Sequence, residues 1–405
     1  MPSETTGRVR GAECIPLSEP DLRGNESKYV QECLDTSWVS SAGAYVETFE
    51  QMVARDVGVP HAVAMVSGTA ALHVGLRVVG VEPDDEVLVP ALTFIAPANA
   101  VRYLGAWPVF MDVDPEFWQL DVDKVARFLD EQCGWHQGRL RNRTTGRRVR
   151  AIMPVHLLGH PCPIGQVLEL ARRYELKVVA DATEALGAQC RSSTTGGWAA
   201  AAAFGDVACL SFNGNKIITT GGGGMLLTTE GRLAATARYL STQAKDDPVE
   251  CVHGDIGYNY RLTNIQAAIG VGQMERLPEF IKTKRQIARN YEHAFRSIRG
   301  VTPMREAPWA FSTFWLYTIQ VEGARFGMES RALRAELAGQ GIQCRPVWQP
   351  LHRSRPHATA QAYAVEVADR CYREGLSLPC SVSLTTDQQA RVIATIRGAG
   401  GLGSQ

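Results

Sequence analysis

Short apolar runs alternate with segments that repeat apolar residues every three or four positions along the first 270 residues of this 405-residue chain. The runs predict strands and the periodic segments predict helices. We expect strands at 62–66, 86–89, 107–111, 151–155, 176–180 and 206–212. We expect helices between most of them, at 70–79, 95–104, 121–131 and 164–174. Strands and helices alternating at intervals of roughly 20–30 residues are typical of a mostly parallel α/β sheet.

The flanking segments carry helical spacing, and the pattern changes near residue 300. Further helices are predicted at 22–35, 45–57, 230–240, 265–277 and 280–298, with a break at Pro278. Beyond them, a strand at 314–320 and an extended segment at 342–346 mix with helices at 330–340, 363–372 and 386–396. This arrangement is α+β, without repeated βαβ units. We therefore predict a large α/β domain over residues 1–270, including the N-terminal segment, and a smaller C-terminal α+β domain over 271–405.

The composition narrows the class of protein but does not identify a function. Hydrophobic residues make up 45% and charged residues 21% of the chain, and 42 basic residues balance 42 acidic ones. A net charge of zero gives no bulk electrostatic reason to expect nucleic acid or an acidic membrane as a partner. Residues 1–14 lack the apolar core of a secretory signal, and no apolar run suits a membrane span. The ten cysteines form no CxxC pair, so we expect neither disulfides nor a metal site, in a cytoplasmic protein.

The stretch from Leu210 to Thr228 holds the first candidate for chemistry. A buried strand ends in the turn Asn213-Gly214-Asn215, and Lys216 follows between apolar residues, ahead of four glycines at 221–224. Burial would favour the neutral, nucleophilic amine that a Schiff-base lysine needs, and glycines would let backbone pass close to a bound ring or phosphate. The alternative interpretation of this stretch is an exposed lysine in a glycine-rich hairpin.

Several other polar or aromatic residues follow the predicted strands directly. Ligands of parallel sheets bind at the carboxyl ends of strands, where Thr69, Phe94, Asp112 and Asp181 all fall. Ser67-Gly68-Thr69 stands between a strand and a helix, which suits a phosphate held by free helix N–H groups, although a plain helix cap is the alternative. The arginine-rich segment 138–150 is either a solvated surface loop or a contact for a substrate diphosphate.

One cofactor accounts for a phosphate cradle, an aromatic residue, an acid and a lysine at one sheet edge. Pyridoxal phosphate needs helix N–H groups and hydroxyls for its phosphate, a stacking face for its ring, a carboxylate for its pyridine nitrogen and a lysine for its aldehyde. The rival is a dinucleotide site, but no G-x-G-x-x-G follows a predicted strand, and no Walker sequence is present.

The ordered motifs of the chain resemble the DegT–StrS family of sugar aminotransferases, which are pyridoxal-phosphate enzymes of fold type I. The resemblance runs from about residue 15 to near the C-terminus. It rests on SGTAAL (67–72), VPALTFIAPANA (89–100), DVDP (112–115), VHLLG (155–159), DATEALGA (181–188), SFNGNK (211–216), GGGGM (221–225) and GYNYRLTNIQAAIG (257–270). It implies an aspartate-aminotransferase-like fold and a homodimer with shared active sites.

The resemblance also implies roles for individual residues. Lys216 would be the Schiff-base lysine and proton shuttle, Asp181 the partner of the pyridine nitrogen, and Phe94 the stacking residue. The other cofactor positions that it implies are Gly68, Thr69, Glu184, Ser211 and, from the second subunit, Asn259. It places three further residues near the substrate, namely His156, His352 and, across the dimer, Arg261. For the two histidines, the alternative is a loop residue whose hydrogen bonds are formed within the protein. Gly222 stands where relatives commonly have glutamate.

The implied function is transamination in amino-sugar biosynthesis. An amino acid, expected to be L-glutamate, would give its amino group to a keto group of a nucleotide-linked keto-deoxy sugar. The wording of residues 211–224 is similar to enzymes that aminate C4 of UDP-N-acetyl keto-sugars. The alternatives are dehydration, amination of a keto-cyclitol, and a regulatory or binding protein without turnover. Retention of Lys216 and Asp181 argues against the last of these.

Overall fold

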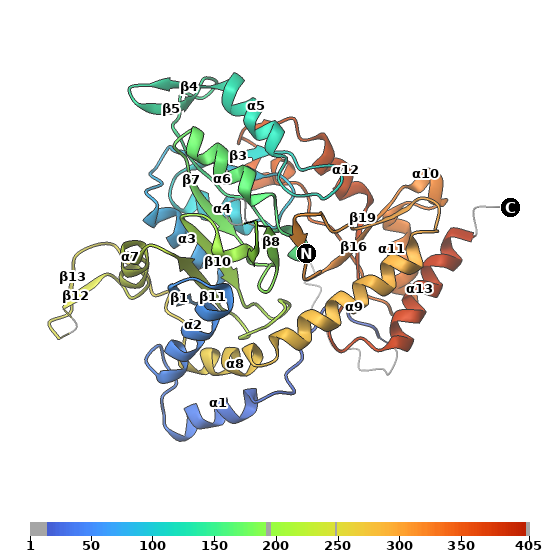
Figure 1. Cartoon of the computed structure of the whole chain (residues 1–405), viewed down its shortest axis with the longest axis horizontal. Helices are drawn as coiled ribbons and strands as arrows, with labels where there is room; N and C mark the ends of the chain where they lie inside the picture. Colours follow the sequence, from blue (N-terminus) through green and yellow to red (C-terminus); the bar gives the residue numbers. More distant parts are fainter. Residues whose placement is uncertain (1–13, 192–195, 248, 402–405) are drawn as a thin grey trace.

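The computed structural model describes residues 14–191, 196–247 and 249–401, and an eight-stranded sheet lies at its centre (Figure 1). The strand order is β1-β11-β10-β7-β6-β2-β3-β18. Only β11 runs antiparallel to its neighbours among these strands, so the sheet is mostly parallel, as predicted. Its strands are β1 (His61–Met65), β2 (Glu86–Pro90), β3 (Trp107–Met111), β6 (Val149–Ile152), β7 (Lys177–Asp181), β10 (Val207–Ser211), β11 (Gly224–Thr228) and β18 (Ala362–Tyr363).

Helices cover both faces of this sheet because its side chains alternate between two hydrophobic cores. Val63 and Met65 of β1 belong to the core shared with α3, α4 and α7, whereas Ala62 and Ala64 belong to the core shared with α2, α5, α6 and α8. The helices of this part are α1 (Glu26–Asp35), α2 (Ala44–Val57), α3 (Gly68–Val78), α4 (Ala96–Tyr103), α5 (Val122–Gln132), α6 (Ile164–Arg173), α7 (Gly231–Ser241) and α8 (Asn264–Met274).

A four-stranded antiparallel sheet forms from the last third of the chain, and α9 (Leu277–Phe295) runs toward it from α8 (Figure 1). Its order is β14-β16-β19-β17. The elements are β14 (Val301–Pro303), β16 (Tyr317–Val321), β17 (Arg345–Pro346), β19 (Gly375–Leu378), α10 (Gly323–Phe326), α11 (Ser330–Gly339), α12 (Glu366–Glu374) and α13 (Thr386–Gly401). The domain boundary near residue 270 stays a prediction. The two predicted domains also include residues 1–13 and 402–405, which lie outside the described residues.

Two sequence predictions need correction here. The sequence pattern predicts a helix from Tyr363, but Tyr363 pairs with Met111 in β18, and α12 begins only at Glu366. A two-residue edge strand is too short to show a period, so the pattern could not reveal it. The break expected at Pro278 lies instead between Met274 and Leu277, and Pro278 sits in the first turn of α9. Proline is tolerated there because first-turn N–H groups have no partner inside the helix.

The arginine-rich segment 138–150 includes the second strand of a hairpin and leads into β6, and several of its arginines contact the protein itself. Strand β4 (Cys133–His136) pairs with β5 (Arg139–Asn142). Arg148 bridges to Asp85 and Glu82, and Arg150 donates to the carbonyl of Val79 at 2.7 Å. These contacts fasten the end of the segment to the turn before β2, so Arg148 and Arg150 have structural partners.

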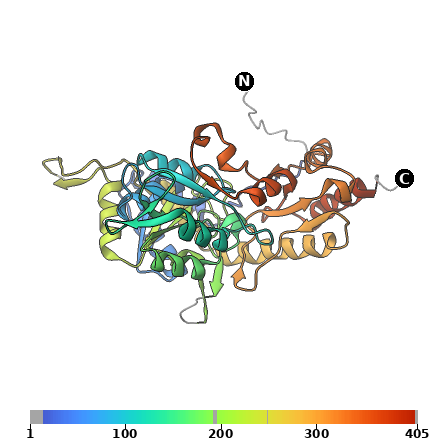
Figure 2. The ribbon, with the colours of Figure 1, turned by 90° about the horizontal axis from the view of Figure 1, so that it is seen from above.

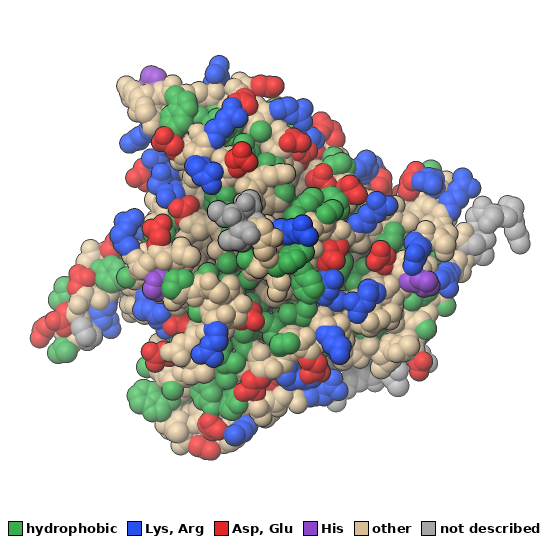
Figure 3. All heavy atoms as spheres, viewed as in Figure 1, with side chains coloured by type: hydrophobic (Ala, Val, Ile, Leu, Met, Phe, Trp, Pro, Cys, Tyr) green, Lys and Arg blue, Asp and Glu red, His purple; other side chains and the backbone are tan. Residues whose placement is uncertain are grey.

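Besides the β4–β5 hairpin, two small sheets lie outside the two main ones. One short sheet joins β8 (Gln189–Arg191), β9 (Trp198–Ala200) and β15 (Ala310–Phe311), while β12 (Lys245–Asp247) and β13 (Val252–His253) form a hairpin that projects from the body (Figures 1 and 2). Acidic and basic side chains are interspersed over the face seen in Figure 3. Within the described residues, no helix has the length and apolar character to cross a bilayer.

Candidate active site

A cavity of about 320 Å³ opens where strand ends of the large sheet face the four-stranded sheet. Strands β1, β2, β7 and β10 share one direction, so the residues that follow them meet at one edge. Seven of the residues predicted to bind a cofactor line this cavity, namely Gly68, Thr69, Phe94, Asp181, Glu184, Ser211 and Lys216. The topology therefore gathers positions that are up to 148 residues apart in sequence, from 68 to 216.

Asp181 is the last residue of β7, and its carboxylate is almost entirely buried at 2% exposure. Its Oδ1 accepts a hydrogen bond from the backbone N–H of Thr183 at 3.0 Å. Burial raises the pKa of this carboxyl, and the hydrogen bonds from Thr183 and the charge of Lys216 oppose that rise. A buried carboxylate facing a cavity suits a cationic partner such as a protonated pyridine nitrogen.

Lys216 follows β10 after a tight turn, and its side chain is only 13% exposed. Its Nζ lies 3.6 Å from Oε1 of Glu184 and 3.9 Å from the ring centre of Trp315. Glu184 also accepts the backbone N–H of Leu158 at 2.7 Å through Oε2. Burial raises the pKa of Glu184 to about 7, against the lowering effect of Lys216. The amine thus sits between an acid that titrates near neutrality and an indole face.

The backbone on both sides of Lys216 is held by residues from distant parts of the chain. The carbonyl of Asn215 accepts hydrogen bonds from Nε1 of Trp315 at 2.6 Å and from Oγ of Ser18 at 3.3 Å. Beyond the lysine, Oε1 of Gln273 in α8 accepts the backbone N–H of Thr219 at 3.2 Å. These contacts fix the course of the loop that carries the reactive amine.

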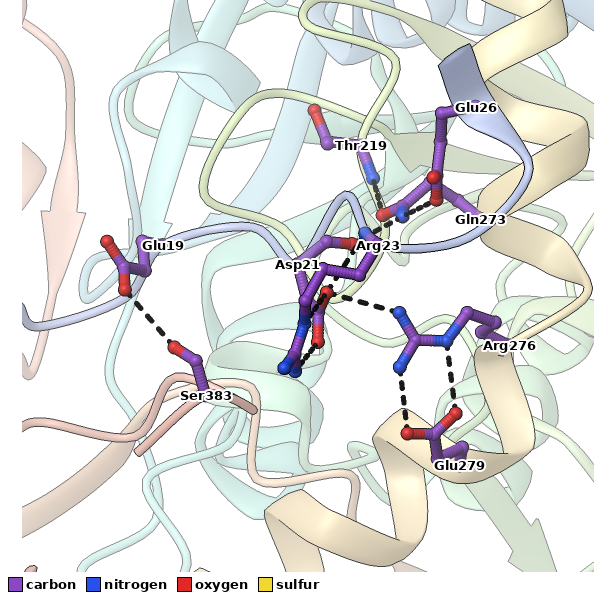
Figure 4. A network of polar contacts seen from close by, with 9 residues as sticks. All are labelled: Glu19, Asp21, Arg23, Glu26, Thr219, Gln273, Arg276, Glu279 and Ser383. Atoms are coloured by element: carbon purple, nitrogen blue, oxygen red, sulfur yellow. Dashed lines mark hydrogen bonds and ion pairs between the residues drawn. The ribbon is translucent and has the colours of Figure 1, made fainter. Parts of the chain in front are cut away.

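Gln273 extends this support to the N-terminal segment. Figure 4 shows its side chain between Thr219 and the start of α1. Its Nε2 donates to the carbonyl of Asp21 at 2.7 Å and to Oε1 of Glu26 at 2.6 Å. Asp21 is itself bridged to Arg276 at 3.1 Å, so one buried amide joins the lysine loop, α8 and the segment before α1.

The N-terminus of α3 forms the part of the cavity that suits a phosphate. Ser67 caps the helix, its Oγ accepting the backbone N–H of Ala70 at 3.1 Å. A Cβ atom on Gly68 would lie 2.8 Å from Cβ of Ser211, so a side chain there would close the space beside that hydroxyl. Free N–H groups and hydroxyls at a helix start are a recurrent anion site. Phe94 is 53% exposed although it lines the cavity, which leaves a ring face for a planar ligand. These residues fit pyridoxal phosphate.

Four residues from the sequence analysis lie outside the lining of this cavity. His156 is fully buried, accepts the N–H of Cys162 at 3.0 Å, and has its pKa lowered to about 4 by burial. His352 faces Asp369 at 3.4 Å, and burial lowers its pKa. Both are held by other parts of the protein. Arg261 is bridged to Glu50, and Asn259 is exposed near the projecting hairpin. Contacts of the latter two across a dimer remain predictions.

The C-terminal region contributes a wall of the cavity that the sequence did not predict. This wall consists of Trp315, Leu316, Gln343, Arg345, Pro346, Val347, Trp348 and Ser377. Trp315 was placed only within a predicted strand, and residues 342–346 only within an extended segment. Trp315 and Arg345 could have been noticed as large side chains in short extended segments. The sequence does not show which sheet edge these segments face.

The fold and the site together define a fold-type-I pyridoxal-phosphate enzyme, as predicted. The chain belongs to the DegT/DnrJ/EryC1/StrS aminotransferase family, whose model matches residues 20–397. This confirms the predicted family and the enzyme class. The chain is 39% identical over 383 residues to the GDP-perosamine synthase of Caulobacter vibrioides (94% of this chain, 97% of the relative) and 37% identical over 382 residues to that of Escherichia coli O157:H7 (94% and 97%). The crystal structure of S. venezuelae DesV is similar, with a TM-score of 0.83 and 28% identity, covering 96% of this chain and 99% of DesV.

Proposed function

We propose that this chain transfers an amino group from L-glutamate to a keto group of a GDP-linked keto-deoxy sugar. The observation that carries the proposal is the placement of Lys216 and Asp181 in one cavity with a phosphate cradle at the start of α3. The family assignment supports transamination, and the residues of the cavity suit it.

Each residue has a defined task in this reaction. Bound pyridoxal phosphate supplies an electron sink for the carbon that loses its proton. The carboxylate of Asp181 keeps positive charge at the pyridine nitrogen, which its burial makes a strong interaction. The amine of Lys216 would carry the proton between the α-carbon of the donor and the cofactor. The carboxylate of Glu184, 3.6 Å away, stabilises the positive charge of the Lys216 amine when that amine is protonated.

Two kinds of similarity favour different nucleotides for the acceptor. The wording of residues 211–224 is similar to enzymes acting on UDP-linked sugars, whereas two relatives at 39% and 37% identity over almost the whole chain bear GDP in their names. Similarity over the full length includes the C-terminal wall of the cavity, which the short motif does not. We therefore propose GDP as the nucleotide.

The proposal includes a homodimer with shared active sites. Asn259 is exposed and does not line the cavity of its own protomer, so it is available to a partner. The neighbouring hairpin projects from the body (Figure 2), and exposed apolar side chains lie at its turn, Val249 at 84%, and just after it, Ile256 at 77%. The proposed compartment is the cytoplasm, where a thiol such as that of Cys209 stays reduced.

The test is a coupled assay with purified protein, L-glutamate and either a GDP-linked keto-6-deoxy sugar or a UDP-linked keto-sugar. Formation of a GDP-linked amino sugar, identified by mass spectrometry, is the expected result. Amination of the UDP-linked sugar alone would contradict the nucleotide assignment. Loss of water from the sugar without amine transfer would indicate dehydration, and no product from any keto-sugar would favour a protein without turnover.

A further inference from the structure

Four charged side chains line the active-site cavity, and three of them have partners within the protein. Lys216 lies beside Glu184, and Asp181 accepts the N–H of Thr183. The fourth is Arg345, and no described residue forms an ion pair, a hydrogen bond or a ring contact with its guanidinium. Other arginines of the chain, such as Arg148 and Arg261, are bridged to carboxylates. An arginine left without a partner in a cavity is available to an anionic ligand.

The position of Arg345 separates it from the phosphate cradle of the cofactor. It is the first residue of β17 and pairs with Ser377 of β19, in the four-stranded sheet. The cradle is built by Gly68 and Thr69 at the start of α3 and by Ser211 at the end of β10. The cofactor phosphate therefore has its binding groups without Arg345, which belongs to the wall contributed by the C-terminal region.

The same wall extends from the reactive amine toward the cavity mouth. Trp315 lies 3.9 Å from Nζ of Lys216, and Trp348 stacks on Trp315 at 6.2 Å between ring centres and an interplanar angle of 11°. The side chain of Lys216 is mostly buried, whereas Arg345 is exposed. A group bound at Arg345 is therefore farther out than the carbon that reacts at Lys216. The α-carboxylate of an amino acid donor, one bond from the reacting carbon, suits this place less than the diphosphate of a nucleotide-linked sugar.

We propose that Arg345 binds the diphosphate of the nucleotide-linked acceptor. A guanidinium matches phosphate oxygens through two parallel hydrogen bonds, a geometry that lysine does not reproduce. This inference rests on the proposed function, because it assumes a nucleotide-linked substrate. It does not depend on the base, so GDP and UDP should both lose affinity when Arg345 is removed.

The test compares wild type, R345Q and R345K with R353Q as the control, all loaded with pyridoxal phosphate. Arg353 is a partly exposed arginine that is bridged to Asp369 and does not line the cavity. GDP and UDP binding is measured by isothermal titration calorimetry, and the glutamate half-reaction is followed separately by absorbance. We expect R345Q to weaken binding of GDP by about 10-fold to 100-fold, R345K to recover part of it, and R353Q to match wild type. The glutamate half-reaction should be unchanged in all three variants.

Four results would overturn the inference. Unchanged GDP binding by R345Q would show that Arg345 does not hold the diphosphate. A defect confined to the glutamate half-reaction would assign Arg345 to the donor carboxylate, and a loss of bound cofactor would assign it to the cofactor phosphate. The proposed acceptor class is judged separately, by whether wild type binds GDP or UDP at all. A wild type that binds neither would reject both the acceptor class and this role.

Discussion

The amine of Lys216 lies 3.6 Å from the carboxyl of Glu184, and both groups are largely removed from water. Burial alone would favour a neutral acid, while the lysine favours a charged one. The balance leaves the pKa of Glu184 at about 7, above its ordinary 4.5. The charge of Glu184, beside the reactive amine of Lys216, therefore changes with pH in the neutral range.

This relationship predicts how stability depends on pH. Because the folded pKa of Glu184 exceeds the unfolded value, the folded protein binds more protons between pH 4.5 and 7. The contribution of Glu184 to stability is then largest below pH 4.5 and declines as pH rises through that window, by up to about 3 kcal/mol. E184Q should lack this decline. Urea unfolding of cofactor-free wild type and E184Q at pH 5 and pH 8 measures it, and an equal stability difference at both pH values would contradict it.

Two acids at strand ends should respond differently to the same substitution. Asp112 is fully buried but bridged to Lys124 at 2.6 Å, and it accepts the N–H of Ala368 at 2.8 Å. Asp181 faces the cavity instead. D112N should lower the free energy of unfolding by about 1–3 kcal/mol, because it removes the buried counter-charge of Lys124 and leaves that amine only the exposed carboxylate of Glu366, at 3.1 Å, as a charged partner.

D181N should leave thermal stability equal or higher, because it removes the cost of burying a charge. It should also reduce turnover by about 100-fold or more, since the pyridine nitrogen loses its counter-charge. Thermal unfolding and steady-state assays measure the two effects. Destabilisation of D181N to the same extent as D112N would mean that Asp181 is a structural acid.

The glycine run after Lys216 contains positions with different demands. A Cβ atom on Gly224 would lie 2.3 Å from backbone atoms of Ser67, whereas one on Gly222 would meet nothing closer than 3.7 Å. We expect G224A to lower stability by about 2 kcal/mol or more and to weaken cofactor binding, since it displaces the residue that caps α3. G222A should fold normally, and the room at Gly222 agrees with glutamate in relatives. Equal thermal unfolding of the two variants would contradict the close approach of Gly224 to Ser67.

Gln273 should matter for the course of the lysine loop (Figure 4). Q273L removes the acceptor of the Thr219 N–H and the donor to Asp21 and Glu26, all in a buried setting. We expect a loss of about 1–3 kcal/mol in unfolding free energy. If the network positions Lys216, the pH titration of the cofactor absorbance should also shift. The control Q286L changes an exposed glutamine of α9 and should do neither. A stability loss without a spectral shift would make Gln273 purely structural.

The sequence could predict most of the cavity because its chemistry follows strands of a mostly parallel sheet. Lys216, Asp181, Gly68 and Phe94 all stand just past predicted strands, and such ends meet at one edge. It could not separate Asp112 from Asp181, because the difference lies in Lys124 and Ala368, which come from other elements.

The C-terminal contribution was beyond the sequence for a related reason. Trp315 and Arg345 reach the cavity through the packing of one sheet against another, and no local pattern records that packing. His156 and Lys216 look alike as single polar residues after strands, yet His156 is enclosed by protein and Lys216 faces the cavity. Strand β18 was missed because two residues carry no period.

The most direct test of the account is the absorption spectrum of the purified protein before and after addition of L-glutamate, with K216A and K282A beside wild type. Lys282 is an exposed lysine of α9 outside the active-site cavity. Wild type and K282A should show a band at about 400–430 nm that moves to about 330 nm with glutamate, and K216A should lack this response. A glutamate-driven shift that survives in K216A, together with turnover, would contradict the assignment of Lys216 as the reactive amine.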